Sequence, residues 1–403
     1  MSVFKPFDVL LPEDKYLPKW PVIACDQFTS QPEYWEALEQ EVGGAPSALR
    51  CILPEVELGS ATEERFAAIR ASMEQYLNGD VFTRYPDSFI YVERTLTNGN
   101  LRAGVVGVID LDAYDYRPDA TSAIRATEKT VVERIPPRMR VRRGAKIELS
   151  HVLLLCDDDS FSLIEPLKGA KGKTAYDLDL TGGGGHIRGT VIDGAEKEAF
   201  LARLDAYEAE KKEALAGMLY AVGDGNHSLA TAKECYEELR QNGAPADVLN
   251  RARYAMVELQ NIHDPVQVFE PIHRLVSGAD ESELLTYLME NCCADQGIEV
   301  PWFTGVASGV LTLDPAKGVL PVGILQNALD AYLADHPGAT DYIHGDEDLK
   351  ELAKKKGNVG FLLPGIPKGD FFRGIARDGV LPRKTFSMGV AREKRYYLEA
   401  REL

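Results

Sequence analysis

The residue types best suited to chemistry stand together in one short segment, Gly223-Asp-Gly-Asn-His-Ser228. The apolar run Met218–Val222, which predicts a buried strand, precedes it, and the pattern from about Leu229 to Gln241 predicts a helix. Glycines let an anionic ligand approach the backbone, and the first amides of a helix lack intrahelical partners at the positive end of its dipole. We therefore predict a phosphate-binding strand–loop–helix. The alternative is a tight turn in which Ser228 is only a helix N-cap.

The side chains of this loop divide into a binding set and a reactive set. The expected phosphate- or nucleotide-binding residues are Gly223, Gly225, Asn226 and Ser228. Asp224 suits a metal ligand or a general base, because a carboxylate can do either. His227 is expected to act in catalysis by stabilising charge on a transferred phosphoryl group.

The loop and its preceding strand resemble the D-G-H-H-R-type loop of the DUF1015 family, and the resemblance extends along most of the chain. It includes the segments Phe4-Lys-Pro-Phe-Asp-Val-Leu10, Ile124-Arg-Ala-Thr-Glu128, Pro271-Ile-His-Arg274 and Leu381-Pro-Arg-Lys-Thr-Phe386. The loop is similar in turn to loops of ParB/sulfiredoxin-like folds, whose members bind nucleotide phosphates and in some cases phosphorylate free serine. This chain has Asn226 in place of the motif's first His and Ser228 in place of its Arg, so a phosphate-binding cation must come from elsewhere.

Two arginines and a glutamate upstream of the loop are candidates for that task. Arg125 and Arg134 could grip phosphate oxygens, because a guanidinium forms paired hydrogen bonds with them. Glu128 is a candidate base toward a substrate hydroxyl. The alternative is a solvated face on which arginine and glutamate pair with each other.

Two segments in the last third of the chain offer further anion-binding groups. His273 and Arg274 are expected to follow a strand and a loop, and the alternative is that they only tie a strand to its neighbours. Arg383 and Lys384 stand in one predicted exposed loop, from which they could reach a polyphosphate.

Polar residues also follow an apolar run near the beginning of the sequence. The substrate-binding candidates there are Asp26, Gln27 and Thr29, because loops at strand ends are where α/β sites assemble. No positive group near Cys25 in sequence would lower its thiol pKa, so cysteine chemistry is not expected. The glycine-rich run Gly182–Gly185 has no predicted strand before it and is interpreted as a mobile flap or a simple loop.

The composition excludes several classes of protein. The 403 residues are 45% hydrophobic and 27% charged, as in ordinary soluble domains. With 45 basic and 63 acidic residues the net charge is −18, which disfavours a general nucleic-acid-binding role. No signal peptide or membrane-spanning run is evident, and the six cysteines lack zinc-ligand spacing. We therefore expect free thiols, a cytoplasmic location, and no nucleic-acid or membrane partner.

Helical and strand patterns are mixed along the chain, which predicts a mixed α/β (α+β) fold. The resemblance implies a ParB/sulfiredoxin-like core elaborated with additional mixed sheet and helices. Asn98-Gly99 between the strand-like runs 88–93 and 101–110 predicts a hairpin. Helices are predicted at 32–42, 61–77, 195–217, 229–241, 281–293, 321–334 and 346–356. Further strands are predicted at 20–25, 149–156, 218–222, 254–260, 309–313, 341–344, 358–363 and 396–401.

We place the boundaries of three regions along the sequence. Residues 1–160 form an N-terminal α/β region with the arginine-rich element, residues 161–275 a core with the phosphate loop, and residues 276–403 a C-terminal α/β region. Among known signatures, no Walker A motif, H-E-x-x-H or G-x-S-x-G occurs.

The resemblance and the loop together favour a small-molecule phosphotransferase. It would use Mg²⁺ and ATP or ADP to phosphorylate a hydroxyl, such as that of free L-serine. A nucleotide-binding sensor without turnover and a metal-dependent phosphohydrolase are the alternatives. The expected partners are a nucleotide and a small-molecule substrate, and the sequence leaves a homodimer open.

Overall fold

The computed structural model describes residues 2–403, which divide into two units. The first unit runs to Ala126, continues over Thr130–Gln267 and ends with Val390–Leu403, and the second consists of Thr127–Lys129 and Val268–Gly389. This division differs from the three consecutive regions expected from the sequence. The difference arises because the last residues return to the first unit, where Ala400 pairs with Leu10 and with Leu149.

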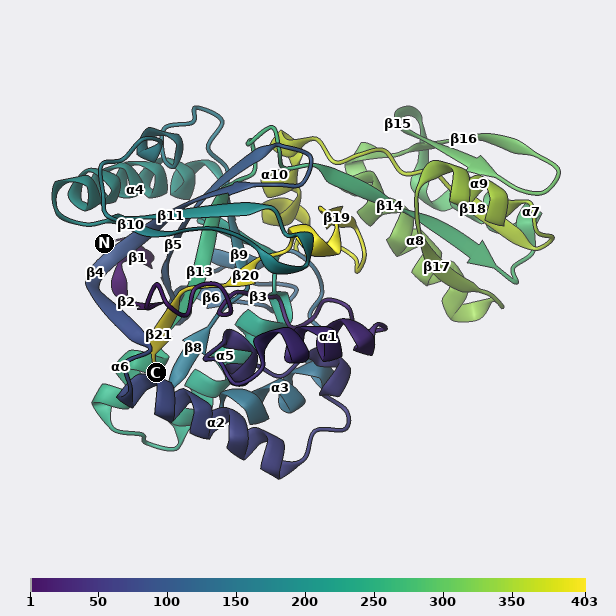
Figure 1. Cartoon of the computed structure of the whole chain (residues 1–403). Helices are drawn as coiled ribbons and strands as arrows, with labels where there is room; N and C mark the ends of the chain where they lie inside the picture. Colours follow the sequence, from purple (N-terminus) through teal and green to yellow (C-terminus); the bar gives the residue numbers. More distant parts are fainter. Residues whose placement is uncertain (1) are drawn as a thin grey trace. The chain divides into compact units, whose positions relative to one another are not determined.

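A mixed sheet of 13 strands forms the centre of the first unit, in the described part of the chain (Figure 1). Its main path is β6 (Tyr114–Asp115), β7 (Ile124–Ala126), β12 (Tyr220–Asp224), β9 (Leu153–Cys156), β13 (Tyr254–Asn261), β5 (Leu101–Asp110), β4 (Phe82–Thr95), β2 (Phe7–Pro12), β21 (Ala400–Glu402) and β8 (Ile147–Leu149). Off this path, β1 (Phe4–Lys5) pairs with β5, and β10 (Thr174–Asp179) and β11 (His186–Ile192) extend from β4.

Helices cover this sheet and bury apolar side chains against it. They are α1 (Pro32–Val42), α2 (Glu63–Asn78), α3 (Ile135–Arg142), α4 (Gly194–Ala214), α5 (Asn226–Gln241) and α6 (Ala246–Ala252). In Figure 1, α2, α3 and α5 lie close together, and α3 contacts both of the others. Ile135 and Met139 of α3 pack against Ala230 and Cys235 of α5, which fixes the helix that follows the phosphate loop.

The second unit has its own antiparallel sheet and core. Five strands follow the order β16 (Ser308–Leu313), β15 (Cys293–Phe303), β18 (Asn358–Phe361), β14 (Phe269–Ser277) and β17 (Ala339–His344), and β19 (Phe386–Met388) also pairs with β14. The helices of this unit are α7 (Glu281–Cys292), α8 (Pro321–Asp335), α9 (Asp346–Ala353) and α10 (Lys368–Asp378). Leu275, Ile343 and Leu349 belong to the core between this sheet and α9.

The structure confirms the mixed α/β class and most predicted elements with strong local signals. Helix α1 has the predicted bounds, and β4 and β5 form the predicted hairpin, with Gly99 at φ +84° in its turn. The six cysteines are free thiols. Within residues 2–403, none of the helices combines the length and the apolar character that crossing a lipid bilayer requires.

Three sequence interpretations need correction. The predicted strand at 149–156 is two strands, because β8 pairs with β21 whereas β9 pairs with β12 and β13, and residues 150–152 belong to neither strand. The run Gly182–Gly185 follows a strand after all, since it is the turn between β10 and β11. A Cβ at Gly185 would lie 2.1 Å from the carbonyl oxygen of Thr95, so this glycine is required by close packing. The segment Pro271–Arg274 lies inside β14 instead of following a strand.

Candidate functional site

The predicted phosphate loop has the geometry of a strand that turns directly into a helix. Strand β12 ends at Asp224, Gly225 takes the left-handed conformation with φ +79° and ψ +25°, and α5 begins at Asn226. Gly225 is therefore the N-cap, and the alternative in which Ser228 is the N-cap is wrong. A glycine cap has no side chain to occupy the first amides of α5, so these amides are suited to an anion.

Sheet pairing brings a buried histidine beside this loop. Strands β12 and β9 are antiparallel, with Asp224 opposite Leu153, so the residues just before β9 lie next to the end of β12. His151 stands there with only 5% of its surface exposed. Its Nε2 lies 3.1 Å from Oγ of Ser228, and its Nδ1 lies 2.7 Å from the hydroxyl oxygen of Tyr397.

The surroundings of His151 keep its ring charged at neutral pH. Burial is the largest single effect and acts to lower its pKa, but Asp26, Cys25 and Asp224 together outweigh burial, and the pKa rises to about 9. Nε2 lies 3.7 Å from Oδ2 of Asp26. The imidazolium donates both ring protons, so the Oγ of Ser228 accepts from His151 and keeps its own proton for another acceptor.

A second pairing of distant segments brings Asp26 and Lys394 to the same place. Strand β3 (Val22–Ile23) is antiparallel to β20 (Tyr396–Tyr397), so the residues after β3 face those before β20. Burial acts to raise the pKa of Asp26, but His151, a 2.9 Å hydrogen bond from Nε2 of Gln27, and the charge of Lys394 hold it below its ordinary value.

The predicted reactive carboxylate, Asp224, bridges the loop and the C-terminal segment. Its Oδ2 lies 3.1 Å from Nζ of Lys394, and its Oδ1 accepts a 2.9 Å hydrogen bond from the backbone N–H of Gly225. Arg94 holds the backbone around Lys394, because its guanidinium donates to the carbonyls of Arg392, Glu393 and Lys394. Asp26, Asp224, His151 and Lys394 therefore form one cluster of alternating charge.

His227 enters the site as a neutral hydrogen-bond donor and not as a cation. Burial, followed by the charges of Arg138 and Arg134, lowers its pKa to about 4. Its Nε2 accepts a 3.2 Å hydrogen bond from the backbone N–H of Val131, so the proton of the neutral ring is on Nδ1. The prediction that His227 stabilises phosphoryl charge is thus restricted to the Nδ1–H group.

Two arginines supply the positive charge that the loop itself lacks. Arg134 precedes α3, its side chain is exposed, and it makes no ion pair within residues 2–403. Arg138, one turn further along, is paired with Glu55 at 2.7 Å and donates to the carbonyl of Arg134 at 2.8 Å. In the described part of the chain, Arg134 is therefore an exposed cation near His227 that has no ion-pair partner.

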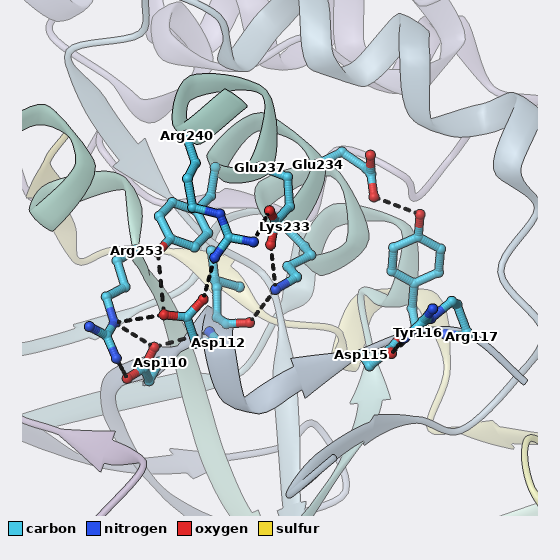
Figure 2. A network of polar contacts seen from close by, with 12 residues as sticks. Asp110, Asp112, Asp115, Tyr116, Arg117, Lys233, Glu234, Glu237, Arg240 and Arg253 are labelled. Atoms are coloured by element: carbon cyan, nitrogen blue, oxygen red, sulfur yellow. Dashed lines mark hydrogen bonds and ion pairs between the residues drawn. The ribbon is translucent and has the colours of Figure 1, made fainter. Parts of the chain in front are cut away.

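The outer face of α5 is anchored to the end of β5, which fixes the direction of the helix (Figure 2). Nζ of Lys233 donates to the carbonyl of Leu111 at 2.9 Å and is 2.9 Å from Glu237. Arg240 pairs with Asp112 at 3.4 Å, and Asp112 also lies 3.4 Å from Arg253. These contacts position the N-terminus of α5 and make no contact with the loop side chains.

Other predicted residues do not join this cluster. The Arg125 side chain, on β7, donates to the carbonyls of Ser122 and Ala216, which precede β7 and β12. Since β7 and β12 are parallel, these carbonyls lie at the end of the strands opposite the loop. The guanidinium of Arg125 therefore makes structural hydrogen bonds at that end of the sheet. Thr29 is exposed in the turn after β3, and no contact ties it to the cluster.

The predicted residues of the second unit have structural contacts of their own. Arg274 is fully buried and donates to Gln326 and to the carbonyls of Ile272, Lys384 and Arg383. His273 accepts from the N–H of Leu363 through Nδ1, and its Nε2 is 3.1 Å from Asp346. Both side chains are buried and make structural contacts within the unit, so they are not exposed anion ligands.

Within that unit, Arg274 shapes the loop that carries the two exposed cations. The side chains of Arg383 and Lys384 are exposed, and the backbone of Lys384 has φ +56°. Oε1 of Glu128 accepts from the backbone N–H of Thr385 at 3.2 Å. The role of Glu128 as a base toward a substrate hydroxyl stays a prediction.

Several members of the cluster could not be predicted from sequence motifs. His151, Lys394 and Tyr397 have no motif around them and meet the loop only through the pairings β9–β12 and β3–β20. A histidine that directly precedes an apolar strand was the one available signal for His151.

The chain was compared with protein families, curated proteins and solved structures. The family model "Protein of unknown function (DUF1015)" matches residues 4–402, and no curated protein matches. A free serine kinase in complex with AMP is 13% identical with a TM-score of 0.38, over 72% of this chain and 90% of that one. A conserved hypothetical protein from Pyrococcus furiosus is 13% identical with a TM-score of 0.34, over 73% and 94%. SbnI with a C-terminal truncation from Staphylococcus aureus is 9% identical with a TM-score of 0.36, over 70% and 83%.

Proposed function

This chain belongs to the DUF1015 family of proteins of unknown function, and we propose that it transfers a phosphoryl group from a nucleotide to the hydroxyl of a small molecule. The observation that carries the proposal is the loop at 223–228. Gly225 turns β12 into α5 without a side-chain cap, His227 stands in the first turn of α5, and Arg134 is close enough to His227 for its charge to lower the pKa of that ring. This arrangement suits a phosphate group.

The chemistry of such a transfer needs positioning and charge stabilisation more than covalent help. Ser228 accepts from the charged His151 and can donate its own proton to a phosphoryl oxygen. His227 donates from Nδ1, and Arg134 supplies the full positive charge. A neutral donor, a hydroxyl donor and a cation thus act on the transferred group from one side.

The donor set also fits a magnesium ion that is held mainly by phosphates and water. Mg²⁺ commonly takes one or two protein carboxylates in nucleotide sites. No group of three or more histidine, cysteine or acidic side chains suited to a metal occurs within residues 2–403, so an all-protein cage is absent there. Asp224 would hold the ion after exchange of its partner Lys394, and the ion would neutralise phosphate charge.

The acceptor hydroxyl is assigned to the side of the cluster that carries Asp26. A new bond forms between its oxygen and the γ-phosphorus as the bond to the nucleoside diphosphate breaks, and its proton passes to the carboxylate of Asp26. Gln27 orients that carboxylate through the hydrogen bond at 2.9 Å. ATP is the proposed donor, and free L-serine is the acceptor expected from the family resemblance.

A binding experiment with a matched pair of variants tests the phosphate site. Arg134→Ala removes the unpaired cation, whereas Arg140→Ala removes a nearby cation of α3 that pairs with Glu63. Isothermal titration with ATP and Mg²⁺ is expected to show a loss of about tenfold or more for Arg134→Ala, the worth of one charge-assisted hydrogen bond. Arg140→Ala should bind as the wild type does.

A turnover screen separates the three candidate functions. ATP and ADP are incubated with Mg²⁺, with and without hydroxyl compounds that include L-serine. A phosphorylated acceptor supports the proposal. Free phosphate alone would replace it with phosphohydrolase activity, and binding without any product would replace it with a sensor. Equal ATP affinity of both arginine variants and the wild type would remove the loop as the phosphate site.

A further inference from the structure

An apolar cavity of about 140 Å³ lies in the first unit and opens against the phosphate loop. Residues from distant parts of the chain line it, and most of its wall is apolar. The apolar lining includes Ile52, Leu53, Met73, Leu149, Leu229 and Met256. A cavity of about this volume is large enough to hold a molecule the size of benzene.

Polar side chains are interspersed in the wall of the cavity, and some of them belong to the cluster described above. Ser228, His151 and Tyr397 line it, and they are the residues joined by hydrogen bonds of 3.1 and 2.7 Å. An apolar molecule inside the cavity that carried a hydroxyl group could therefore bring this group to the phosphate loop. Ligand sites commonly combine such an apolar wall with a small number of placed polar groups.

A second polar group of the wall has an unused hydrogen-bond donor. Arg142 lines the cavity, and its Nη1 pairs with Oε1 of Glu148 at 2.7 Å. Its Nη2 is buried and has no hydrogen-bond partner within residues 2–403. A buried donor without a partner costs about 1–3 kcal/mol, so an acceptor oxygen from a ligand would be stabilising there.

We propose that the acceptor substrate is a hydroxy acid with an apolar body, which binds in this cavity with its hydroxyl toward Ser228 and His151 and its carboxylate on Arg142. The proposal rests on the proposed phosphotransfer, because it names the substrate class of that reaction. Free L-serine fits the cavity poorly. It has one side-chain carbon to place against the apolar wall, and its ammonium group would lose water on entering the cavity. The nearest acidic side chains of the wall, Glu55 and Glu148, are already paired with arginines.

Direct binding to the full chain without nucleotide tests the cavity separately from the reaction. The probes are 6-hydroxyhexanoate, hexan-1-ol and L-serine, measured by saturation-transfer NMR and isothermal titration. The proposal predicts that 6-hydroxyhexanoate binds about tenfold or more tightly than either of the others. It alone combines an apolar chain that contacts the wall with a carboxylate that forms a charge-assisted bond. Equal affinity for 6-hydroxyhexanoate and hexan-1-ol would overturn the role of Arg142.

Variants that fill the cavity give the second readout. Ala232→Leu places a larger side chain in the wall, and Ala145→Leu does so at a partly exposed lining position, in case the first variant does not fold. Both should weaken 6-hydroxyhexanoate binding about tenfold or more, as expected when the space is occupied. The matched control is Ala209→Leu on the exposed face of α4, which should leave affinity unchanged. Equal affinity in all three variants would overturn the cavity as the site.

The reaction itself is then assayed with ATP and Mg²⁺. Phosphorylation of 6-hydroxyhexanoate in preference to L-serine supports the substrate class. Phosphorylation of L-serine in preference overturns the substrate class and leaves the proposed phosphotransfer intact. Tight binding of the hydroxy acid with no phosphorylation of any acceptor overturns the phosphotransfer, and it leaves the cavity as a ligand site only.

Discussion

Replacing Gly225 by alanine tests the geometry of the loop most sharply, because two separate costs can be read from the structure. Gly225 has φ +79°, a conformation that costs about 1–2 kcal/mol for a residue with a Cβ. The added Cβ would also lie 3.1 Å from Cα and from Cγ2 of Val152, and 3.4 Å from Cδ2 of His151. Relief of this contact requires the loop to move away from β9, and overpacking of this kind costs about 1–3 kcal/mol.

A glycine at the other end of the same helix provides the control. Gly243 follows α5 with φ +67°, and a Cβ there would meet no atom within 4 Å. Gly243→Ala therefore carries the conformational cost alone, about 1–2 kcal/mol. The two variants should differ by about 1–3 kcal/mol in the free energy of unfolding of the first unit.

Urea denaturation followed by tryptophan fluorescence measures this difference. A Trp302→Phe background leaves Trp20 and Trp35 as the fluorophores, and both lie in the first unit. Isothermal titration with ATP and Mg²⁺ supplies the second readout, in which Gly225→Ala should lose about tenfold or more in affinity because the first amides of α5 move away from His151. Equal unfolding free energies together with equal ATP affinities for the two variants would refute the reasoning.

Two further predictions concern titration and the second unit. His151 should titrate near pH 9 and His227 near pH 4 in NMR spectra, on opposite sides of their ordinary value of 6.5. The folded pKa of His151 is raised, so its contribution to stability is complete below about pH 6.5 and is lost as the pH rises through 9. The folded pKa of His227 is lowered, so its contribution to stability is complete above about pH 6.5 and is lost as the pH falls toward 4. Titration of both histidines near pH 6.5 would contradict their assigned surroundings. Arg274→Ala should destabilise the second unit by about 3 kcal/mol, measured by urea denaturation, because it leaves buried carbonyls and Gln326 without partners. Unchanged stability with weaker ATP binding would instead restore Arg274 as an anion ligand.

Much of the local structure could be predicted because its signals lie within a few residues. Pro32 in the first turn of α1, Asn98-Gly99 between two strand patterns, and the glycines before α5 each act through their own backbone. The same holds for Asp224 and Asp26, since each follows an apolar strand directly. Residues at strand ends are therefore natural candidates for a site, and the structure places Asp224 and Asp26 in one charged cluster.

The partners themselves could not be predicted because they come from pairings between distant segments. His151 and Tyr397 are 246 residues apart in sequence, and their hydrogen bond depends on two different strand pairings. The predicted anion-binding roles of arginines in strands could not be judged from sequence for a related reason. Arg125 and Arg274 turn back to backbone carbonyls, and an arginine in a strand pattern looks the same in sequence whether it binds a carbonyl or a phosphate.

The phosphorus NMR spectrum of ATP during incubation with the protein, Mg²⁺ and a hydroxy acid tests the central claim most directly. The account predicts a new phosphomonoester signal with the wild-type chain and a rate lower by about 100-fold or more with Asp224→Asn, because that carboxylate serves the reacting phosphate. Asp205→Asn, on the exposed face of α4, should keep the wild-type rate. A wild-type rate in Asp224→Asn, or no phosphomonoester with any hydroxyl compound, would contradict the assignment of this loop to phosphoryl transfer.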